Sequence, residues 1–327
     1  MKKVRKPFLF VAIVTLFVSA LAAAQNPRAQ APGGLPGASG RGAERGPGGG
    51  RGRGGPHNMK TLLIWADTRN GIAQHDSVSH AMSVIERLGY ESGTYFSYIR
   101  TDSNIASYSP KMTTGQPASG GPSFATADAI FFLGHREVPI DDTQKAELLN
   151  FVHDDGKGFV AAHTASNAWM DWPEFGDLLG GRYDDHPWGV TEAPVIVEDP
   201  DFPGMKFFPR AFDFRDEFYQ ISEFSPEKSR VLLRLDTSKL DMTKRGVHAA
   251  DAPFPLAWAK MYGKGRVFYS SLGHDAATWD NPDIQRMWFS AIEWALGLKD
   301  ADVTPQPVSP TAPAAAATPA QASVPGR

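Results

Sequence analysis

Four of the nine histidines in this 327-residue chain each follow a run of apolar residues with the composition of a β-strand. They are His75, His135, His163 and His274. In an open parallel sheet the carboxyl ends of the strands meet at one edge, and ligands collect in the crevice there. The sequence therefore predicts one shared site built from side chains that are far apart in the chain.

Imidazoles and carboxylates in one crevice can do two kinds of chemistry. In the first, histidines from among His75, His135, His163 and His274 hold a divalent metal ion such as Zn²⁺ together with a carboxylate, and the ion polarises a carbonyl or activates water. In the second, histidine and carboxylate groups act as acid and base without a metal. The chain contains no short-spaced pair of the type His-x-x-x-His, so the metal interpretation depends on convergence in space. Each histidine alone could equally be a cap, a core imidazole or a surface residue.

A second group of polar and aromatic residues lies within residues 180–188. An aromatic ring can stack on the C–H face of a sugar while polar side chains bind its hydroxyls. The alternative is an ordinary surface loop. Together with two residues that follow the first strand, this gives the predicted substrate-binding set of His75, Asp67, Arg182, His186 and Trp188.

Two adjacent carboxylates, Asp216 and Glu217, occur in the second half of the chain. A carboxylate there could serve as a base or metal ligand, or could pair with Arg215 on the surface. The predicted catalytic residues are His163, His274, Glu217 and Asp216.

Three apolar runs, 61–65, 129–133 and 158–162, predict buried parallel strands. Helical spacing predicts three helices between and after them. The first begins near Asp76 or Ser77 and stops at Gly89, the second is capped by Asp141, and the last is capped by Asn281 with Pro282 at its first position. Shorter strand-like runs occupy 195–197, 231–235 and 266–269. This pattern predicts an α/β fold with a doubly wound, mostly parallel sheet and an added β-rich region.

The two ends of the chain differ in composition from its centre. Four basic residues, an apolar run from Phe8 to Leu21 and three alanines predict a signal peptide over residues 1–24. We therefore expect an exported protein, periplasmic or secreted, without stable membrane insertion after cleavage. Residues 25–57 are rich in Gly, Arg and Pro and residues 301–327 in Pro and Ala, so both are predicted to be disordered. The folded domain is then expected to span residues 58–300.

Charge is unevenly distributed along the chain. The predicted leader and linker each carry a net charge of +4, so the domain carries about −11 although the whole chain carries −3. An acidic domain is a poor nucleic-acid binder, so we expect no nucleic-acid partner. The expected partner is a small-molecule carbohydrate, and the sequence is compatible with a homo-oligomer.

Several segments together resemble the ThuA-like (trehalose-utilisation) family. They are 156–163, 178–182 with His186 and Pro187, 216–219, and 263–269 with 272–274. They occur in the family's order and span most of residues 60–298. His75 and the Gly134-His135 pair also resemble the family.

The resemblance implies a fold similar to class I glutamine amidotransferases and a role in disaccharide or 3-keto-sugar metabolism. His163 stands about where that fold places its nucleophilic cysteine, and His274 near its catalytic histidine. The chain contains no cysteine, which excludes thiolate glutaminase chemistry. We thus expect an enzyme of the hydrolase, lyase or isomerase type. The alternatives are a non-catalytic carbohydrate-binding domain and an envelope scaffold protein that uses the Arg/Gly linker.

If the linker is only a solvated spacer, deleting residues 25–57 should change neither the localisation of the protein nor the partners recovered with it. Fractionation and co-purification of the deletion variant test this. Loss of a partner would favour the envelope scaffold instead.

Overall fold

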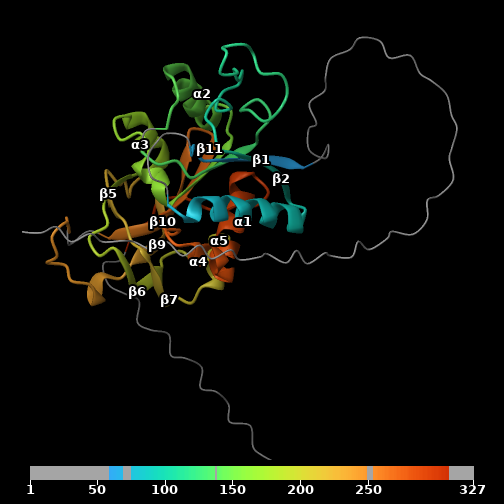
Figure 1. Ribbon diagram of the computed structural model, residues 1–327. Helices are drawn as coiled ribbons and strands as arrows, with labels where there is room; N and C mark the ends of the chain where they lie inside the picture. The colour runs from blue at the N-terminus through green and yellow to red at the C-terminus, as the bar shows by residue number, and fades with distance from the viewer. Residues whose placement is uncertain (1–58, 69–74, 137, 249–252, 309–327) are drawn as a thin grey trace, which may run out of the picture. The chain divides into compact units, whose positions relative to one another are not determined.

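The computed structural model describes residues 59–68, 75–136, 138–248 and 253–308 (Figure 1). The predicted leader and linker lie outside these residues. Within the described part of the chain, no helix combines the length and the apolar character needed to cross a membrane.

A nine-stranded sheet with the order β2-β1-β3-β4-β11-β10-β9-β6-β7 forms the centre of the fold. Each neighbouring pair from β2 to β11 is parallel. The order of these five strands is that of a flavodoxin-like doubly wound sheet, which confirms the predicted fold class. The parallel strands are β1 (Lys60–Trp65), β2 (Tyr95–Arg100), β3 (Ala129–Phe132), β4 (Gly158–Ala162) and β11 (Gly265–Ser270).

The predicted β-rich region is an antiparallel extension of the same sheet. Each pair from β11 to β7 is antiparallel, so β7 runs in the same direction as β11. Only residues 195–197 of β6 pair with β9, and the rest of β6 forms a ribbon with β7 alone. The strands are β6 (Val190–Val197), β7 (Ala211–Glu217), β9 (Arg230–Leu235) and β10 (Phe254–Tyr262), with β5 (Arg182–Asp185) and β8 (Gln220–Ser222) in a separate pair.

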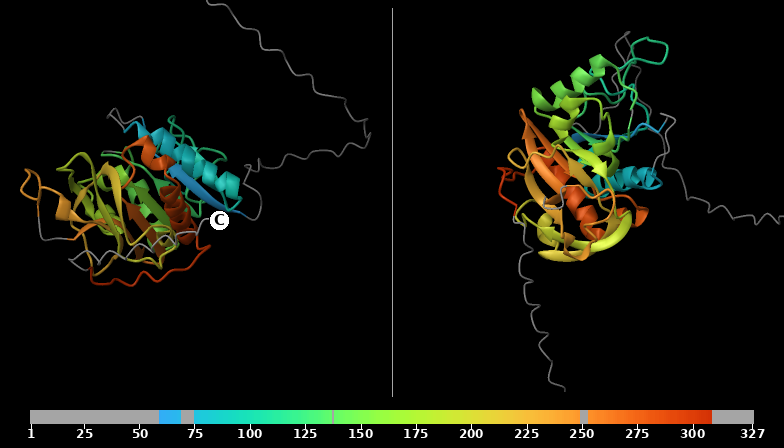
Figure 2. Two further views of the ribbon diagram at one scale, coloured as in Figure 1. Left: turned by 90° about the horizontal axis from the view of Figure 1, so that it is seen from below. Right: turned by 90° about the vertical axis from the view of Figure 1, so that its left-hand side faces the viewer.

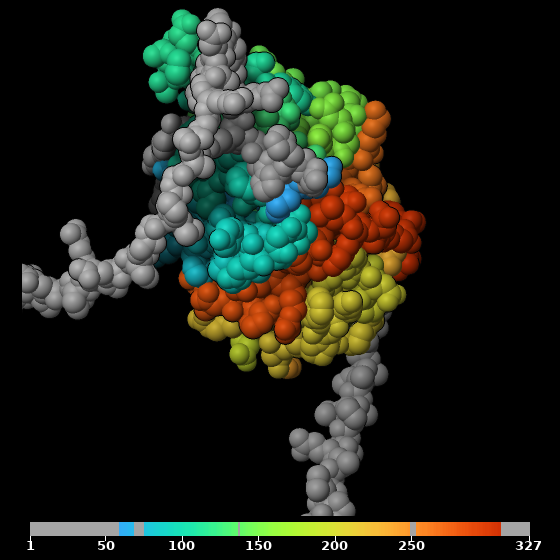
Figure 3. All heavy atoms as spheres, turned by 90° about the vertical axis from the view of Figure 1, so that its right-hand side faces the viewer, coloured from blue at the N-terminus to red at the C-terminus, as the bar shows by residue number. Residues whose placement is uncertain are grey.

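Helices cover both faces of the sheet (Figures 1 and 2). One hydrophobic cluster packs under α1 (Ser77–Ser92) and α5 (Pro282–Ala295), and another under α2 (Asp142–His153) and α3 (Pro173–Leu179). Figure 3 shows α1 beside the C-terminal helices, where Arg87 donates a hydrogen bond to Gln285. The short elements are α4 (Ala276–Asp280) and the 3₁₀ turns His163–Asn167, Met205–Phe207 and Thr237–Lys239.

The first helix ends later than the sequence predicts. Gly89 does not terminate α1 but allows close packing, because a Cβ atom there would lie 2.2 Å from the ring of Tyr95. The helix ends at Gly93 instead, which has a φ of 65° and donates its N–H to the carbonyl of Gly89. The glycine that stops the helix is therefore the one in the left-handed conformation.

The domain also extends beyond the predicted boundary at residue 300. Ala301 and Val303 pack against the hydrophobic core, and Arg230 donates a hydrogen bond to the carbonyl of Thr304. The start of the predicted disordered tail is thus part of the packed structure, while residues 309–327 lie outside the described part.

The predicted caps of the other two helices are confirmed. Asp141 forms a reciprocal capping box with Gln144. The side chain of Asn281 accepts hydrogen bonds from the backbone N–H groups of Asp283 and Ile284.

Asn281→Ala should lower the free energy of unfolding by about 0.5–2 kcal/mol, because two N–H groups at the start of α5 lose their acceptor. Asn281→Asp keeps an acceptor and should stay close to wild type. Urea unfolding of the three proteins measures both differences, and equal stability of Asn281→Ala and wild type would contradict the capping role.

Candidate metal and active site

A cavity of about 520 Å³ opens where the parallel strands end. Polar side chains dominate its wall, and they come from the ends of β5 and β7 and from the segments that follow β1, β3, β4, β5, β7 and β11. The predicted crevice at the carboxyl edge of the sheet is therefore present.

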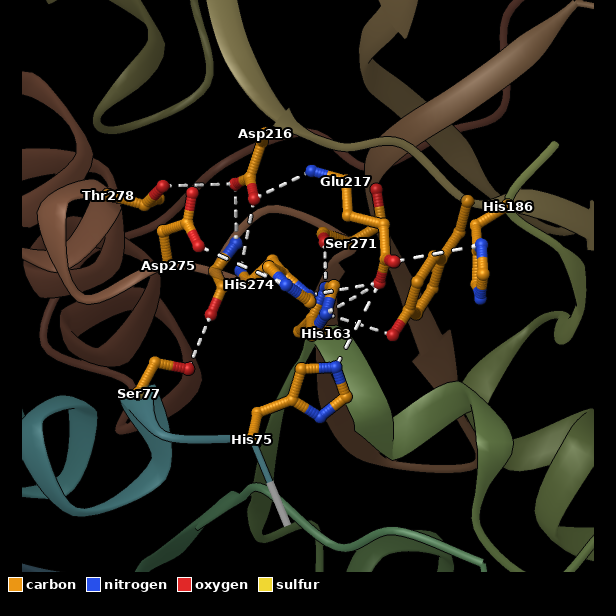
Figure 4. Close-up of polar contacts among 12 residues, drawn as sticks. His75, Ser77, His163, His186, Asp216, Glu217, Ser271, His274, Asp275 and Thr278 are labelled. Atoms are coloured by element: carbon orange, nitrogen blue, oxygen red, sulfur yellow. Dashed lines mark hydrogen bonds and ion pairs between the residues drawn. The ribbon is translucent and has the colours of Figure 1, made fainter. Parts of the chain in front are cut away.

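Three histidines and one glutamate meet at this edge (Figure 4). One nitrogen or oxygen atom from each of His75, His163, Glu217 and His274 lies within 4.8 Å of the other three. The Oε2 atom of Glu217 lies 3.9 Å from Nε2 of His75, 3.6 Å from Nε2 of His163 and 3.0 Å from Nδ1 of His274. We call these four residues the His₃Glu cluster.

His135 is the strand-end histidine that does not join the cluster. It lines the cavity, and its ring centroid lies 5.6 Å from that of His75. The structure thus brings three of the four predicted metal ligands together and adds Glu217, which the sequence analysis assigned to catalysis.

The single carboxylate of the cluster and its imidazoles shift one another's pKa values. Burial acts to raise the pKa of Glu217, but the imidazoles that surround its carboxylate outweigh burial and hold the pKa well below its usual range. The contact with Glu217 raises the pKa of His274, whereas burial lowers that of His163. Glu217 is therefore an ionised acceptor, paired most closely with His274.

Asp216 lies behind the cluster and not in the cavity wall (Figure 4). Its carboxylate is fully buried and accepts hydrogen bonds from the backbone N–H groups of Glu217, Gly273 and His274 and from the hydroxyl of Thr278. Burial raises its pKa, and these donors act in the opposite direction. All its acceptor positions face protein donors, so we assign Asp216 a positioning role instead of the predicted catalytic one.

The turn over residues 271–274 ties the cluster together. The carbonyl of Ser271 accepts a hydrogen bond of 2.5 Å from Nδ1 of His163. The carbonyl of Gly273 accepts one from the hydroxyl of Ser77, which stands two residues after His75. Gly273 has a φ of 137°, a conformation that side chains other than glycine rarely adopt.

His163 itself adopts a strained backbone conformation. Its φ is 43° directly after β4, where the chain turns into a 3₁₀ helix. Such outliers are stabilised by their surroundings and are often found at functional sites. Here the hydrogen bond to Ser271 and stacking on Tyr219 fix the ring, with centroids 4.3 Å apart.

Three residues of the 180–188 group were predicted to bind substrate, and of these His186 lines the cavity. Its Nδ1 atom lies 3.6 Å from Oε1 of Glu217, on the side opposite the other histidines. The cavity wall also contains Arg136, Tyr183 and Tyr219, which the sequence analysis did not single out. Tyr219 could have been found, because it lies two residues after Glu217 at the end of a strand.

Three predicted substrate-binding residues do not line the cavity. Asp67 is buried and accepts a hydrogen bond from Ser103. Arg182 is buried and donates to the carbonyls of Trp169 and Trp172. Strand alternation turns Tyr183, and not Arg182, toward the cavity.

Trp188 is the third predicted substrate-binding residue that does not line the cavity. Its indole N–H donates to the carbonyl of Asp241, and its ring packs against Phe254. It therefore stabilises the β-rich region.

Asp216→Asn should destabilise the protein by about 1–3 kcal/mol, since an amide N–H₂ must face a backbone or hydroxyl donor. Asp213→Asn is the matched control on the same strand, because Asp213 is exposed and its carboxylate lies 3.4 Å from the ammonium of Lys239. It should stay within about 0.5 kcal/mol of wild type. Urea unfolding separates the two, and equal effects would contradict the positioning role.

Comparison with known structures and families agrees with this architecture. A ThuA-like protein from Bacteroides uniformis is 20% identical, with a TM-score of 0.57 and coverage of 77% of this chain and 98% of that one. A ThuA-like protein from Parabacteroides merdae is 19% identical, with a TM-score of 0.54 and coverage of 76% and 92%. No curated protein sequence matches this chain. The family model ThuA, described as trehalose utilisation, matches residues 61–295, and the chain therefore belongs to the ThuA family.

Proposed function

We propose that this protein is an enzyme of carbohydrate metabolism that holds a divalent metal ion such as Zn²⁺ at the His₃Glu cluster. Its substrate is a disaccharide or another glycoside, or the 3-keto derivative of one. Membership of the trehalose-utilisation family supports the substrate class. The convergence of four ligand atoms within 4.8 Å is the observation that carries the metal proposal.

The spacing of the cluster fits a single ion. Ligand atoms about 2.0–2.1 Å from a common Zn²⁺ lie about 3.3 Å apart in a tetrahedron. The distances of 3.0, 3.6 and 3.9 Å from Glu217 Oε2 to the three imidazole nitrogens bracket this value. The three contacts of Glu217 therefore fit a shared ion, and the four ligand atoms, all within 4.8 Å of one another, would have to draw together around it.

The hydrogen bonds around His163 favour the same role. A carbonyl oxygen only accepts, so Nδ1 of His163 carries the proton in its bond to Ser271. Nε2 then carries the lone pair of the ring, and this nitrogen faces the cluster. A metal-binding histidine commonly uses its second nitrogen to donate to a carbonyl or carboxylate in this way.

When bound, such an ion polarises a carbonyl oxygen of the substrate or lowers the pKa of a water molecule. The residues of the chain bind and orient the sugar around this centre. Arg136 and Tyr183 line the cavity as hydrogen-bond donors, and Asp275 lines it as an acceptor. His186 stands beside Oε1 of Glu217, where it can exchange a proton with a substrate oxygen.

A metal-free version of this enzyme is the second candidate. It is favoured by the 3.0 Å contact between His274 and Glu217, which forms an acid–base pair inside the cavity. A binding domain without catalysis would use the same wall but produce no turnover. Metal content and turnover together separate these three functions.

The N-terminal order of basic, apolar and small residues supports a proposal that the enzyme works outside the cytoplasm, in the periplasm or in the medium. Mass spectrometry of protein recovered from these compartments tests it. A mature chain that begins near Gln25 is expected, and an intact Met1 would contradict export.

Purified wild-type protein should contain about one divalent ion per chain, and His163→Ala and His274→Ala should each weaken binding by more than about tenfold. The same variants should lose turnover of 3-keto-disaccharides and the parent glycosides. His153→Ala is the control, because His153 is exposed and contacts Asp154 away from the cavity. Elemental analysis, titration with Zn²⁺ and product analysis are the measurements.

Folded His163→Ala and His274→Ala proteins that turn over these sugars like wild type would contradict the assignment of the site. Turnover that survives complete removal of metal would leave the acid–base version. Sugar binding measured by calorimetry, with no product under any metal, would leave the binding domain.

A further inference from the structure

The hydroxyl of Tyr219 lies 2.9 Å from Nε2 of His163. This is the nitrogen that the His₃Glu cluster directs toward its centre. The other nitrogen, Nδ1, already donates to the carbonyl of Ser271. Nε2 is therefore the acceptor, and the Tyr219 hydroxyl is the donor.

The ring of Tyr219 is held firmly in this position. It stacks on the ring of His163 with an interplanar angle of 26°, and Tyr183 packs edge-on against it with centroids 4.8 Å apart. The side chain is buried, yet it lines the cavity. Loss of the hydrogen bond to His163 would thus free the hydroxyl without moving the ring away from the site.

A metal ion and the Tyr219 hydroxyl compete for one lone pair. A neutral imidazole has a single lone pair, which lies on Nε2 when Nδ1 is protonated. An ion bound at Nε2 takes that lone pair, and the hydroxyl must find another acceptor. The side of the ring that remains open is the cavity, where the substrate binds under the function proposed above.

We propose that Tyr219 occupies the metal-binding nitrogen of His163 in the ion-free site and gives it up when a divalent ion binds. Ion binding thereby turns the Tyr219 hydroxyl into a hydrogen-bond donor for an oxygen atom of the substrate. Tyr219 is then a substrate-contacting residue only in the ion-loaded protein, so sugar binding and metal binding are coupled. This inference rests on the metal site of the proposed function.

Tyr219→Phe is the discriminating variant, with Zn²⁺ alone as the probe. It removes the competing hydroxyl but keeps the stacked ring, so Zn²⁺ should bind about two- to tenfold more tightly than to wild type. Tyr183→Phe is the matched control, because it removes a hydroxyl from the same cavity wall at a ring that does not stack on His163. Its Zn²⁺ affinity should stay within about twofold of wild type. His163→Ala gives the residual Zn²⁺ affinity of a protein in which the cluster is incomplete.

A second measurement follows the hydroxyl directly. Addition of Zn²⁺ to the full-length wild-type protein should produce a tyrosine difference spectrum in the near ultraviolet, because the hydroxyl of Tyr219 loses its hydrogen-bond acceptor, Nε2 of His163. Tyr219→Phe should lose this change, and Tyr183→Phe should keep it.

Unchanged or weaker Zn²⁺ binding by a folded Tyr219→Phe protein would overturn the inference but leave the metal site intact. Weaker binding would identify Tyr219 as a ligand or support of the ion. Wild-type binding no tighter than that of His163→Ala would overturn the metal site itself, and the inference with it.

Discussion

The carboxylate of Asp216 fixes the turn over residues 271–274, and this turn connects all four members of the His₃Glu cluster. The turn contains His274, accepts the Nδ1 proton of His163 through Ser271, and is bonded through Gly273 to Ser77 near His75. Glu217 is the neighbour of Asp216 in β7. Because one turn is bonded to the elements that carry all four residues, we expect the positions of these residues to depend on one another.

The second constraint is electrostatic. Three imidazoles and one carboxylate share a partly buried space, and the carboxylate stays ionised because the imidazoles surround it. His274 lies closest to this carboxylate, and the contact with Glu217 raises the pKa of its imidazole. Because a metal ligand must be deprotonated, protons and a divalent ion would compete for the imidazole nitrogens around Glu217.

Topology made most of the site predictable from the sequence. Parallel strands end at one edge, so His75, His135 and His163 had to approach each other once their strands were recognised. Arg182 and Trp188 do not line the cavity, although the sequence analysis predicted that they bind substrate. Which side of β5 a side chain points to depends on the register of the strand, and the composition of the segment does not reveal that register. Asp67 and Asp216 show a similar limit, because a buried carboxylate with protein donors and an accessible one look alike in sequence.

His163 has a strained backbone conformation directly after a central strand of the sheet. A strained residue after a central strand can present a nucleophile, as in other α/β enzymes, but an imidazole locked by a carbonyl at one nitrogen and facing a carboxylate at the other cannot attack freely. Its Nε2 atom lies among the ligand atoms of Glu217, His75 and His274 and accepts a hydrogen bond from the hydroxyl of Tyr219. Under the function proposed above, this backbone strain serves to aim a metal ligand and not a nucleophile.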